Sequence, residues 1–249
     1  MNNDEEKLLI FAKKVVKESL NLLHKNKSFE YTLKKKNKRE FKSKIDIELN
    51  NFILRKLDKF KFKIFSEESK KFKLSKEKDY VWILDPLDGT FNYVRGLSNC
   101  AVSLALIKKN TLVFGVVGTF PYGDIYYGGK NFGSFKNNKK IKISKTKLFK
   151  NAIIATGFPA NSNFTNNYKK NFFNIVNKFA KIRMVGSAAC SLVYLAEGTI
   201  DNYYEQNIKL WDIAGGLAIC QGVGAIINLK KIDNYNSYDL KVSNKFLCI

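Results

Sequence analysis

The spacing of the hydrophobic residues changes near residue 61, and this change constrains the fold of the chain most. Before it, apolar residues recur every three or four positions in two segments, 4–25 and 43–60, which predicts two amphipathic helices. Ser43 is the expected N-cap of the second helix, and Asp46 stands where a capping box places its acidic residue. After residue 61 the apolar runs become short and β-type, so the chain is not all-helical.

The rest of the chain alternates predicted strands with predicted helices. Short apolar runs predict strands at 62–66, 80–85, 100–107, 111–119, 124–128, 152–156, 182–185, 201–204, 224–229 and 239–243. Helical spacing predicts helices near 165–180, 187–198 and 212–222. Residues 29–42 are polar and predict a loop or a short hairpin. Without a repeat or a Pro- or Gly-rich linker, this order fits layered α/β or α+β sheets packed with helices.

Length and apolar patterning limit the class of protein. A chain of 249 residues is long enough for one large core or two joined lobes. Its longest apolar stretches, such as 100–107 and 111–120, are separated by polar residues and are too short to span a bilayer. The acidic residues Asp4, Glu5 and Glu6 are unlike the start of a secretory signal. We therefore expect a cytoplasmic protein with no membrane partner.

The formal net charge of +22 favours polyanionic partners, so nucleic acid has to be considered. The excess comes mostly from lysines spread along the whole chain, which indicates a compositional bias rather than one binding patch. Its densest run, 34–39, is best explained by a solvated loop or hairpin; steering of an anionic substrate and contact with nucleic acid are the functional alternatives. No interleaving of aromatic and basic residues typical of RNA-binding motifs accompanies it.

Missing residue types exclude several classes of catalyst. His24 is the only histidine, so a Ser-His-Asp triad, a histidine phosphatase and a His-rich zinc site are excluded. A Walker loop fails because Asp124 replaces its first glycine, and an Asp-x-Asp phosphatase fails because Asp85 and Asp88 are three apart. No cysteine is followed by the Arg of a cysteine phosphatase, and no Cys-x-x-Cys occurs. We expect reduced, buried thiols at positions 100, 190, 220 and 248.

Among the catalysts considered, only those that use carboxylates remain. The motif that indicates them most clearly is Trp-Ile-Leu-Asp-Pro-Leu-Asp-Gly-Thr at 82–90. An apolar strand delivers Asp85 at its end, and the following turn lets Asp88 face the same point. Carboxylate oxygens are the ligands that Mg²⁺ selects, and two so close repel unless a cation lies between them. Gly89 allows close approach to an anion, and amides of Gly89 and Thr90 at a helix start would point at a phosphate. An Asp-Pro turn followed by an N-cap is the structural alternative.

Two further acidic segments support this interpretation. Ser-Glu-Glu-Ser at 66–69 places Glu67 just after a β-type run, although a solvated turn also explains it. Leu-Trp-Asp-Ile-Ala-Gly at 210–215 places Asp212 at a helix start between apolar residues, where an N-cap is the alternative.

Together these three segments resemble the signature motifs of the inositol monophosphatase family, in the family's order and at its usual separations. The resemblance covers nearly the whole chain. It implies a layered αβαβα sandwich of the inositol monophosphatase/fructose-1,6-bisphosphatase type. It also implies one domain over 1–249, with two lobes at about 1–140 and 141–249, and a homodimer.

The resemblance implies a mechanism with two Mg²⁺ ions and a third, weaker metal near Glu67. Glu67, Asp85 and the carbonyl of Leu87 would hold one ion, and Asp85, Asp88 and Asp212 the second. Water would be activated by Glu67 and Thr90, with Asp46 accepting a hydrogen bond from Thr90. The attack on the phosphate is then direct, without a phosphoenzyme.

The substrate residues implied by the resemblance are Asp88, Gly89 and Thr90, the loop Gly186-Ser187-Ala188, and Glu205, which would bind substrate hydroxyls. The chain departs from the family pattern at Lys42-Ser43, where Val-Thr is usual, at Ser66, where Gly is usual, and at Phe91, where Thr is common. It also ends soon after Ser243-Asn244, so the family's C-terminal packing and dimer contacts cannot be assumed.

The expected function is therefore Mg²⁺-dependent hydrolysis of small, anionic phosphate monoesters, foremost inositol or sugar phosphates. Fructose-1,6-bisphosphate and 3′-phosphoadenosine phosphates are alternatives within the same fold. A regulator associated with nucleic acid and built on the phosphatase fold is the alternative from another class. It is not favoured, because the metal-binding carboxylates are intact.

Overall fold

The structure of the protein is a computed structural model in which the described residues are 3–26, 34–35, 41–68, 79–158, 164–233 and 236–249. Most of the predicted polar hairpin at 29–42, and most of the lysine-rich run at 34–39, lie outside these residues. What is described of them is a two-residue pairing of β1 (Lys34–Lys35) with β2 (Phe41–Lys42).

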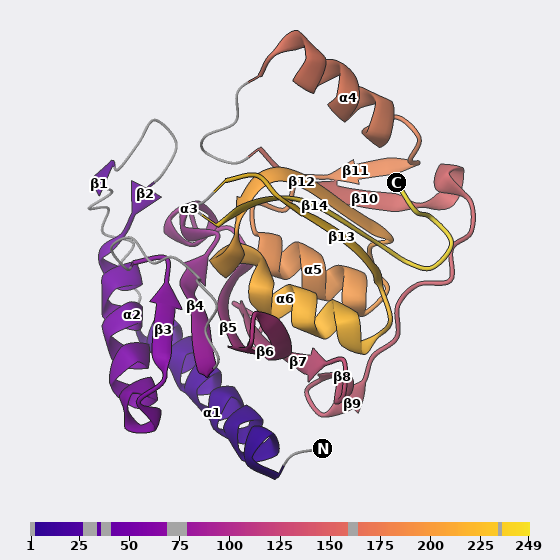
Figure 1. The fold of residues 1–249 in the computed structure, drawn as a ribbon. Helices are drawn as coiled ribbons and strands as arrows, with labels where there is room; N and C mark the ends of the chain where they lie inside the picture. Colours follow the sequence, from indigo (N-terminus) through magenta and orange to yellow (C-terminus); the bar gives the residue numbers. More distant parts are fainter. Residues whose placement is uncertain (1–2, 27–33, 36–40, 69–78, 159–163, 234–235) are drawn as a thin grey trace.

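Five layers follow one another through the molecule (Figure 1). Helices α1 (Asn3–Lys25) and α2 (Lys44–Leu57) cover one face of a large sheet, whose other face packs against α5 (Ala188–Ala196) and α6 (Leu210–Gly222). A smaller sheet lies beyond α5 and α6, and α4 (Asn166–Val176) covers its outer face. This order of helices and sheets confirms the predicted αβαβα sandwich.

In the described part of the chain the large sheet has seven strands in sequence order, with β3 parallel to β4 and all other neighbours antiparallel. Helices cover both of its faces, which explains why its central strands are continuous apolar runs. The strands are β3 (Lys63–Ser66), β4 (Tyr80–Asp88), β5 (Cys100–Lys108), β6 (Thr111–Phe120), β7 (Ile125–Gly129), β8 (Gly133–Lys136) and β9 (Lys139–Lys140).

The small sheet has five strands in the order β11-β10-β12-β14-β13. Strand β10 runs parallel to β11 and β12, whereas β14 is antiparallel to β12 and β13. Its strands are β10 (Ile153–Thr156), β11 (Lys181–Arg183), β12 (Asn202–Lys209), β13 (Ile226–Lys231) and β14 (Ser237–Ser243). The remaining short elements are α3 (Thr90–Val94), η1 (Asp58–Phe60) and η2 (Phe149–Asn151).

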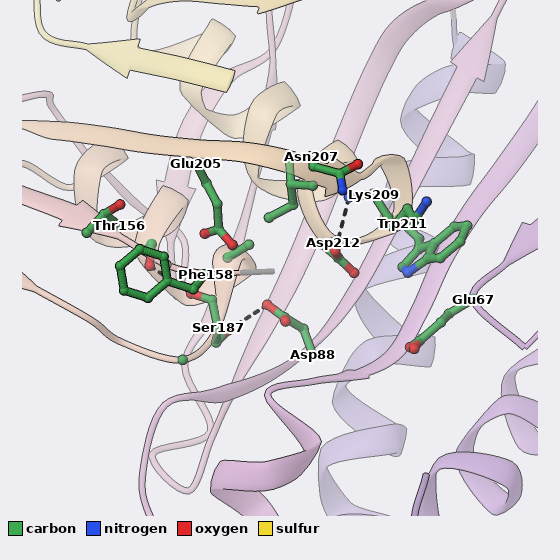
Figure 2. A pocket seen from close by; sticks show the side chains of 15 residues that line it. Glu67, Asp88, Thr156, Phe158, Ser187, Glu205, Asn207, Lys209, Trp211 and Asp212 are labelled. Atoms are coloured by element: carbon green, nitrogen blue, oxygen red, sulfur yellow. Dashed lines mark hydrogen bonds between the residues drawn. The ribbon is translucent and has the colours of Figure 1, made fainter. Parts of the chain in front are cut away.

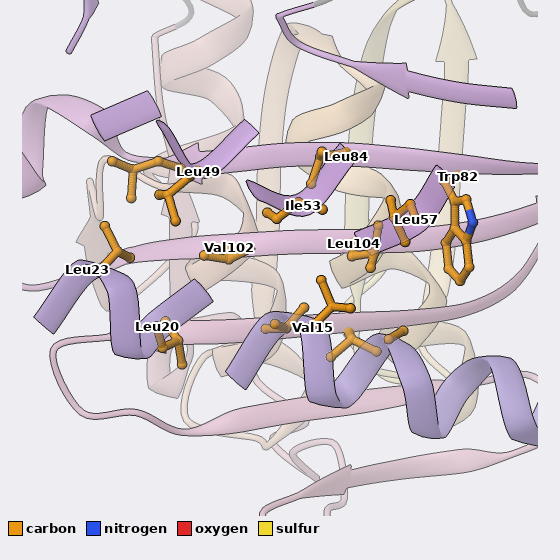
Figure 3. Packing of buried hydrophobic residues seen from close by; sticks show 14 of the residues in the cluster. Val15, Leu20, Leu23, Leu49, Ile53, Leu57, Trp82, Leu84, Val102 and Leu104 are labelled. Carbon is orange, nitrogen blue, oxygen red and sulfur yellow. The ribbon is translucent and has the colours of Figure 1, made fainter. Parts of the chain in front are cut away.

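The two N-terminal helices bury the apolar stripes that the sequence predicts. Figure 3 shows these stripes packed on the inner strands of the large sheet, where Leu20, Leu49 and Trp82 are almost completely inaccessible to solvent. Burying a side chain of this size stabilises the fold by about 1.5–3 kcal/mol. This packing gives the strand that carries Asp85 and Asp88 a rigid support.

Helix α6 reaches the large sheet because two glycines meet. A Cβ atom on Gly115 of β6 would lie only 2.1 Å from the carbonyl oxygen of Gly215. Any side chain there would push the helix away from the sheet. The close approach sets the position of the first turn of α6, which carries Asp212.

Some elements differ from the prediction. Strands β8 and β9 were not predicted, because Gly-Ser-Phe-Lys and Lys-Lys are too short to show an apolar alternation. Strand β4 continues past Asp85 to Asp88, and α6 begins two residues before Asp212. The prediction of buried thiols is wrong for Cys248, which is exposed; the other three cysteines are free and buried. Within the described residues, no helix combines the length and the apolar character needed to cross a membrane.

Candidate active site

A β-bulge in β4 brings Asp85 and Asp88 together. In a regular strand, residues three apart point to opposite faces. Here Asp85 pairs with Ser103 and Asp88 with Ala101, so three steps along β4 match two along β5. The Leu87 amide donates a hydrogen bond of 3.0 Å to Asp85 Oδ1 within the bulge. The irregularity therefore turns both carboxylates toward one point.

Asp212 completes a cluster of three carboxylates from the first turn of α6. One oxygen from each of Asp85, Asp88 and Asp212 lies within 4.8 Å of the other two. The amide of Lys209, which precedes the helix, donates to Asp212 Oδ2 at 3.3 Å. Figure 2 shows Asp88 and Asp212 facing the same space, with Glu67 across from them.

Burial and mutual repulsion disfavour the ionised form of the three carboxylates. Burial, followed by the neighbouring carboxylates, raises the pKa of Asp85 and of Asp212 well above the usual value. Burial also raises the pKa of Asp88 to about 6, although its hydrogen bonds from Ser187 and Ala189 oppose the rise. A divalent cation among these hard oxygens would remove both penalties, so the donor set fits Mg²⁺.

Glu67 and Leu87 lie beside the cluster. Glu67 follows β3, and its amide donates to the carbonyl of Leu84 on β4 at 3.1 Å. Its side chain lines the same cavity as Asp88 and Asp212 but lies outside the three-carboxylate group. The carbonyl of Leu87 is 3.0 Å from Thr90 Oγ1, at the turn that leaves the strand.

Asp46 and Thr90 are in contact although 44 positions separate them. Thr90 Oγ1 donates to Asp46 Oδ1 at 2.7 Å. The other oxygen of Asp46 accepts from the backbone amide of Ser43 at 2.8 Å and from the Ser43 hydroxyl. Ser43, where the family usually has Thr, thus still caps α2 together with Asp46 and holds the carboxylate toward Thr90.

The turn at Gly89 and the loop at Gly186 touch. Gly89 has φ +81° and caps α3, and a Cβ there would lie 3.0 Å from the Asn99 carbonyl and 3.2 Å from that of Gly186. Ser187 caps α5, donating from its hydroxyl to Asp88 Oδ2 at 2.6 Å, and the amide of Ala189 donates to the same oxygen at 2.6 Å. Asp88 thereby joins the carboxylate cluster to the start of α5.

The site opens into a cavity of about 250 Å³ (Figure 2). Asp46, Asp85, Leu87, Gly89 and Thr90 are not among the residues that line it and lie beside or beneath it. The predicted site residues that do line it are Glu67, Asp88, Gly186, Ser187, Ala188, Glu205 and Asp212.

Glu205 lies on the far wall of the cavity, on β12. It is buried and accepts a hydrogen bond of 2.5 Å from the hydroxyl of Tyr203. Burial raises the pKa of Glu205 to about 7, because an ionised carboxylate loses its hydration there. A Cβ on Gly157 would lie 2.6 Å from Glu205 Oε2, so a side chain at position 157 would have to displace this carboxylate.

Besides Gly157, Ser191 and Ile208, the cavity is lined by five residues for which no role was predicted. In the sequence, nothing beyond polarity or size marks Thr156, Phe158 and Lys209 as site residues. Asn207 has φ +57°, a conformation that Asn adopts more readily than most residues. Trp211 was recognised within its motif, and its ring packs edge-on against Phe65 at 5.3 Å. The five are Thr156, Phe158, Asn207, Lys209 and Trp211.

These features define a class of protein: a layered αβαβα sandwich with a cluster of carboxylates suited to divalent metals, held between the end of β4 and the first turn of α6. Comparison with known proteins gives the family. The profile of the inositol monophosphatase family matches residues 4–235. The chain therefore belongs to the inositol monophosphatase family.

Two relatives show the range of names within this family. A fructose-1,6-bisphosphatase/inositol-1-monophosphatase of Aquifex aeolicus is 35% identical over 175 residues, covering 68% of this chain and 64% of that protein. The Nus factor SuhB of Pseudomonas aeruginosa is 33% identical over 153 residues, covering 60% of this chain and 56% of that protein. The match thus spans less than two thirds of either relative.

Solved structures agree with the fold over nearly the full length. An IMPase of Thermotoga maritima superposes with a TM-score of 0.82 at 27% identity, covering 96% of this chain and 93% of that one. The extragenic suppressor protein SuhB of Bartonella henselae superposes with a TM-score of 0.85 at 24% identity, covering 96% and 95%.

Proposed function

We propose that this protein is a Mg²⁺-dependent phosphatase that hydrolyses small phosphate monoesters, foremost inositol or sugar phosphates, by direct attack of water. The observation that carries the proposal is the three-carboxylate cluster of Asp85, Asp88 and Asp212 beside a cavity of about 250 Å³. The family membership of the chain supports the reaction class.

The proposal assigns ligands to each ion. Glu67, Asp85 and the Leu87 carbonyl would hold one Mg²⁺, and Asp85, Asp88 and Asp212 a second, with a weaker third site near Glu67. When bound, Mg²⁺ supplies Lewis-acid stabilisation of the phosphate and of the leaving oxygen, and lowers the pKa of water.

The protein's own groups would orient the nucleophile. The Thr90 hydroxyl donates its hydrogen bond to Asp46 Oδ1 at 2.7 Å, so the lone pairs of Thr90 Oγ1 would face the attacking water and accept a hydrogen bond from it. Glu67 would accept a proton from that water as it attacks the phosphorus. The amides of Gly89 and Thr90 would bind the phosphate oxygens.

The far wall of the cavity suggests the substrate class. Glu205 can accept hydrogen bonds from neighbouring hydroxyls of a polyol. A ligand without them leaves a buried acceptor unpaired, at about 1–3 kcal/mol. Phe91-Asn92 after the Asp-Gly-Thr motif also resembles inositol and sugar phosphatases more than the phosphoadenosine enzymes. We therefore expect kcat/KM for polyol monophosphates to exceed that for adenosine bisphosphates by at least about tenfold.

Phosphate release from a panel of metabolites, measured with Mg²⁺ and with excess chelator, tests the proposal. The panel contains inositol 1-phosphate, fructose 1,6-bisphosphate, hexose monophosphates and 3′-phosphoadenosine 5′-phosphate. Full activity in chelator would contradict the metal mechanism. A preference for the adenosine bisphosphate would contradict the substrate class but leave the metal mechanism standing. Size-exclusion chromatography with light scattering tests the proposed homodimer.

A role with nucleic acid is the second candidate. It is supported by the net charge of +22 and by relatives named as Nus factors. RNA binding measured with the Asp88→Asn variant over a series of salt concentrations separates the two functions. Binding that is retained in this variant and weakens steeply with salt would favour the second candidate. Absence of RNA binding would exclude the second candidate and leave the phosphatase activity as the proposed function.

A further inference from the structure

A second cavity lies on the outer face of the small sheet, away from the active site. It lies between α4 and strands β12, β13 and β14, and its volume is about 440 Å³, larger than that of the active-site cavity. Such a volume is ordinary for a small-molecule site. Its walls are mainly polar, with side chains that include Asn171, Asn174, Gln206, Lys230, Asp239 and Lys241.

One buried acceptor and two ammonium groups of this cavity lack hydrogen-bond or ion-pair partners among the described residues of the protein. Within the part of the chain that the structure describes, Gln206 Oε1 is buried and has no hydrogen-bond partner. A buried unpaired carbonyl costs about 1–3 kcal/mol. No ion pair within 4 Å involves Lys230 or Lys241 among the same residues. The ammonium group of Lys241 instead lies 6.0 Å above the ring of Tyr204.

We propose that this cavity binds a small phosphorylated polyol, such as a sugar phosphate. Two lysines against one aspartate leave a net positive charge, which favours an anionic group. The side-chain amides of Asn171, Asn174 and Gln206 can both donate and accept, as the hydroxyls of a polyol require.

The cavity shares a strand with the active site. Along β12, Glu205 and Asn207 line the active-site cavity, whereas Gln206 between them lines the second cavity. The register of β12 against β14 shifts between Glu205 and Ile208, so this stretch is a bulge. Asp239 of the second cavity accepts a hydrogen bond of 3.1 Å from the Asn207 amide.

Occupation of the second cavity should therefore change substrate binding at the active site. A ligand that engages Asp239 or Gln206 acts on the bulge that positions Asn207 and Glu205, and such coupling is reciprocal in free energy. This coupling rests on the proposed phosphatase function, whereas the binding of the ligand does not.

The binding experiment uses glucose 6-phosphate and isothermal titration calorimetry with the full chain in excess chelator. Without metal, the acidic active site repels a phosphate, so binding there is suppressed. We expect one saturable site, weakened at least about tenfold in Lys230→Gln/Lys241→Gln, because each lysine contributes a charge-assisted hydrogen bond. The control Lys231→Gln/Lys245→Gln removes the same charge from exposed lysines outside the cavity and should bind like the wild type.

Three results would overturn the binding site. They are absence of saturable binding at millimolar glucose 6-phosphate, equal weakening in the control variant, and binding of inorganic phosphate as tightly as the sugar phosphate. The last would show that the cavity does not recognise hydroxyl groups.

The coupling is tested with Mg²⁺ and inositol 1-phosphate as substrate. Glucose 6-phosphate can also compete at the active site as a sugar-phosphate substrate, so the coupling is measured as the difference between proteins. Saturating glucose 6-phosphate should change KM at least about threefold more in the wild type and the control than in Lys230→Gln/Lys241→Gln. An equal change of KM in the wild type, the control and the cavity variant would be competition at the active site alone and would refute the coupling. Absence of hydrolysis in every protein would refute the proposed function, while the calorimetric result on the cavity would stand.

Discussion

Replacing Asp88 by Asn should stabilise the metal-free protein while stopping turnover. The carboxylate of Asp88 accepts 2.6 Å hydrogen bonds from Ser187 Oγ and from the Ala189 amide. The carbonyl oxygen of an asparagine can accept both. The substitution therefore removes a charge from a crowded acidic site without removing the bonds that hold the start of α5.

The pKa of Asp88 sets the size of the effect. A rise from 3.8 to about 6, caused chiefly by burial, corresponds to about 3 kcal/mol of unfavourable free energy in the ionised folded state. Because a raised pKa means that the folded state holds the proton more tightly, this stability is present at low pH. It is lost as pH rises from about 4 to about 6. Asp88 is partly exposed to the cavity, so we expect a gain of about 1–2 kcal/mol for Asp88→Asn at pH 7.5.

Urea denaturation in excess chelator measures this gain. The variant should exceed the wild type at pH 7.5, and the difference should narrow at pH 4.5, where Asp88 is protonated in the folded protein. Asp79→Asn, an exposed carboxylate outside the site, is the matched control and should change stability by less than about 0.5 kcal/mol. Added Mg²⁺ should stabilise the wild type more than Asp88→Asn. A destabilised variant, or one with a near-normal rate of phosphate release, would show that Asp88 has a structural role.

Three other substitutions test separate parts of the structure. Thr90→Val should lower kcat by at least about tenfold with little change in KM, because it removes the hydroxyl between Asp46 and the attacking water; an unchanged kcat would exclude this pair from catalysis. In the metal-free wild type, the raised pKa of Glu205 should lower stability as pH rises from 4.5 to about 7. Glu205→Gln should not show this decrease when both proteins are measured by urea denaturation across the range. Leu49→Ala should destabilise the protein by about 2–5 kcal/mol in the same assay, and a cost below 1 would contradict its place in the core.

The layers of the fold were predictable because they depend on periodicity. Long apolar patterns mark the helices at 4–25 and 43–60 and the central strands of the large sheet. Such patterns can be recognised in a single sequence. Strands β8 (Gly-Ser-Phe-Lys) and β9 (Lys-Lys) are too short and too polar to show a repeating side-chain pattern, so the sequence did not predict them. The division into two lobes near residue 140 remains a proposal.

The acidic members of the candidate site were predictable for a different reason. Asp85, Asp88 and Asp212 stand out in a basic chain because they interrupt apolar runs. A turn after Asp85 already predicted that Asp85 and Asp88 face one point. The bulge in β4 that turns them there, and the contact of Gly115 with Gly215 that positions α6, were not predictable from the sequence. The polar groups at the far wall, such as Thr156 and Asn207, lie on elements distant in sequence and carry no shared pattern.

The site departs from the local rules that the rest of the chain obeys. Strand β4 is buried on both faces and pairs regularly until Asp85, where the ladder slips and places carboxylates in a region that otherwise holds apolar side chains. Such departures usually lower stability and persist where they serve a function. The hydrophobic cores on both sides of β4 are well packed, and their stabilisation can offset the unfavourable free energy of repulsion among the three carboxylates. Relief of this repulsion by a cation would contribute to the free energy of metal binding. Metal affinity and the stability that the metal adds should therefore change together when any of the three aspartates is replaced.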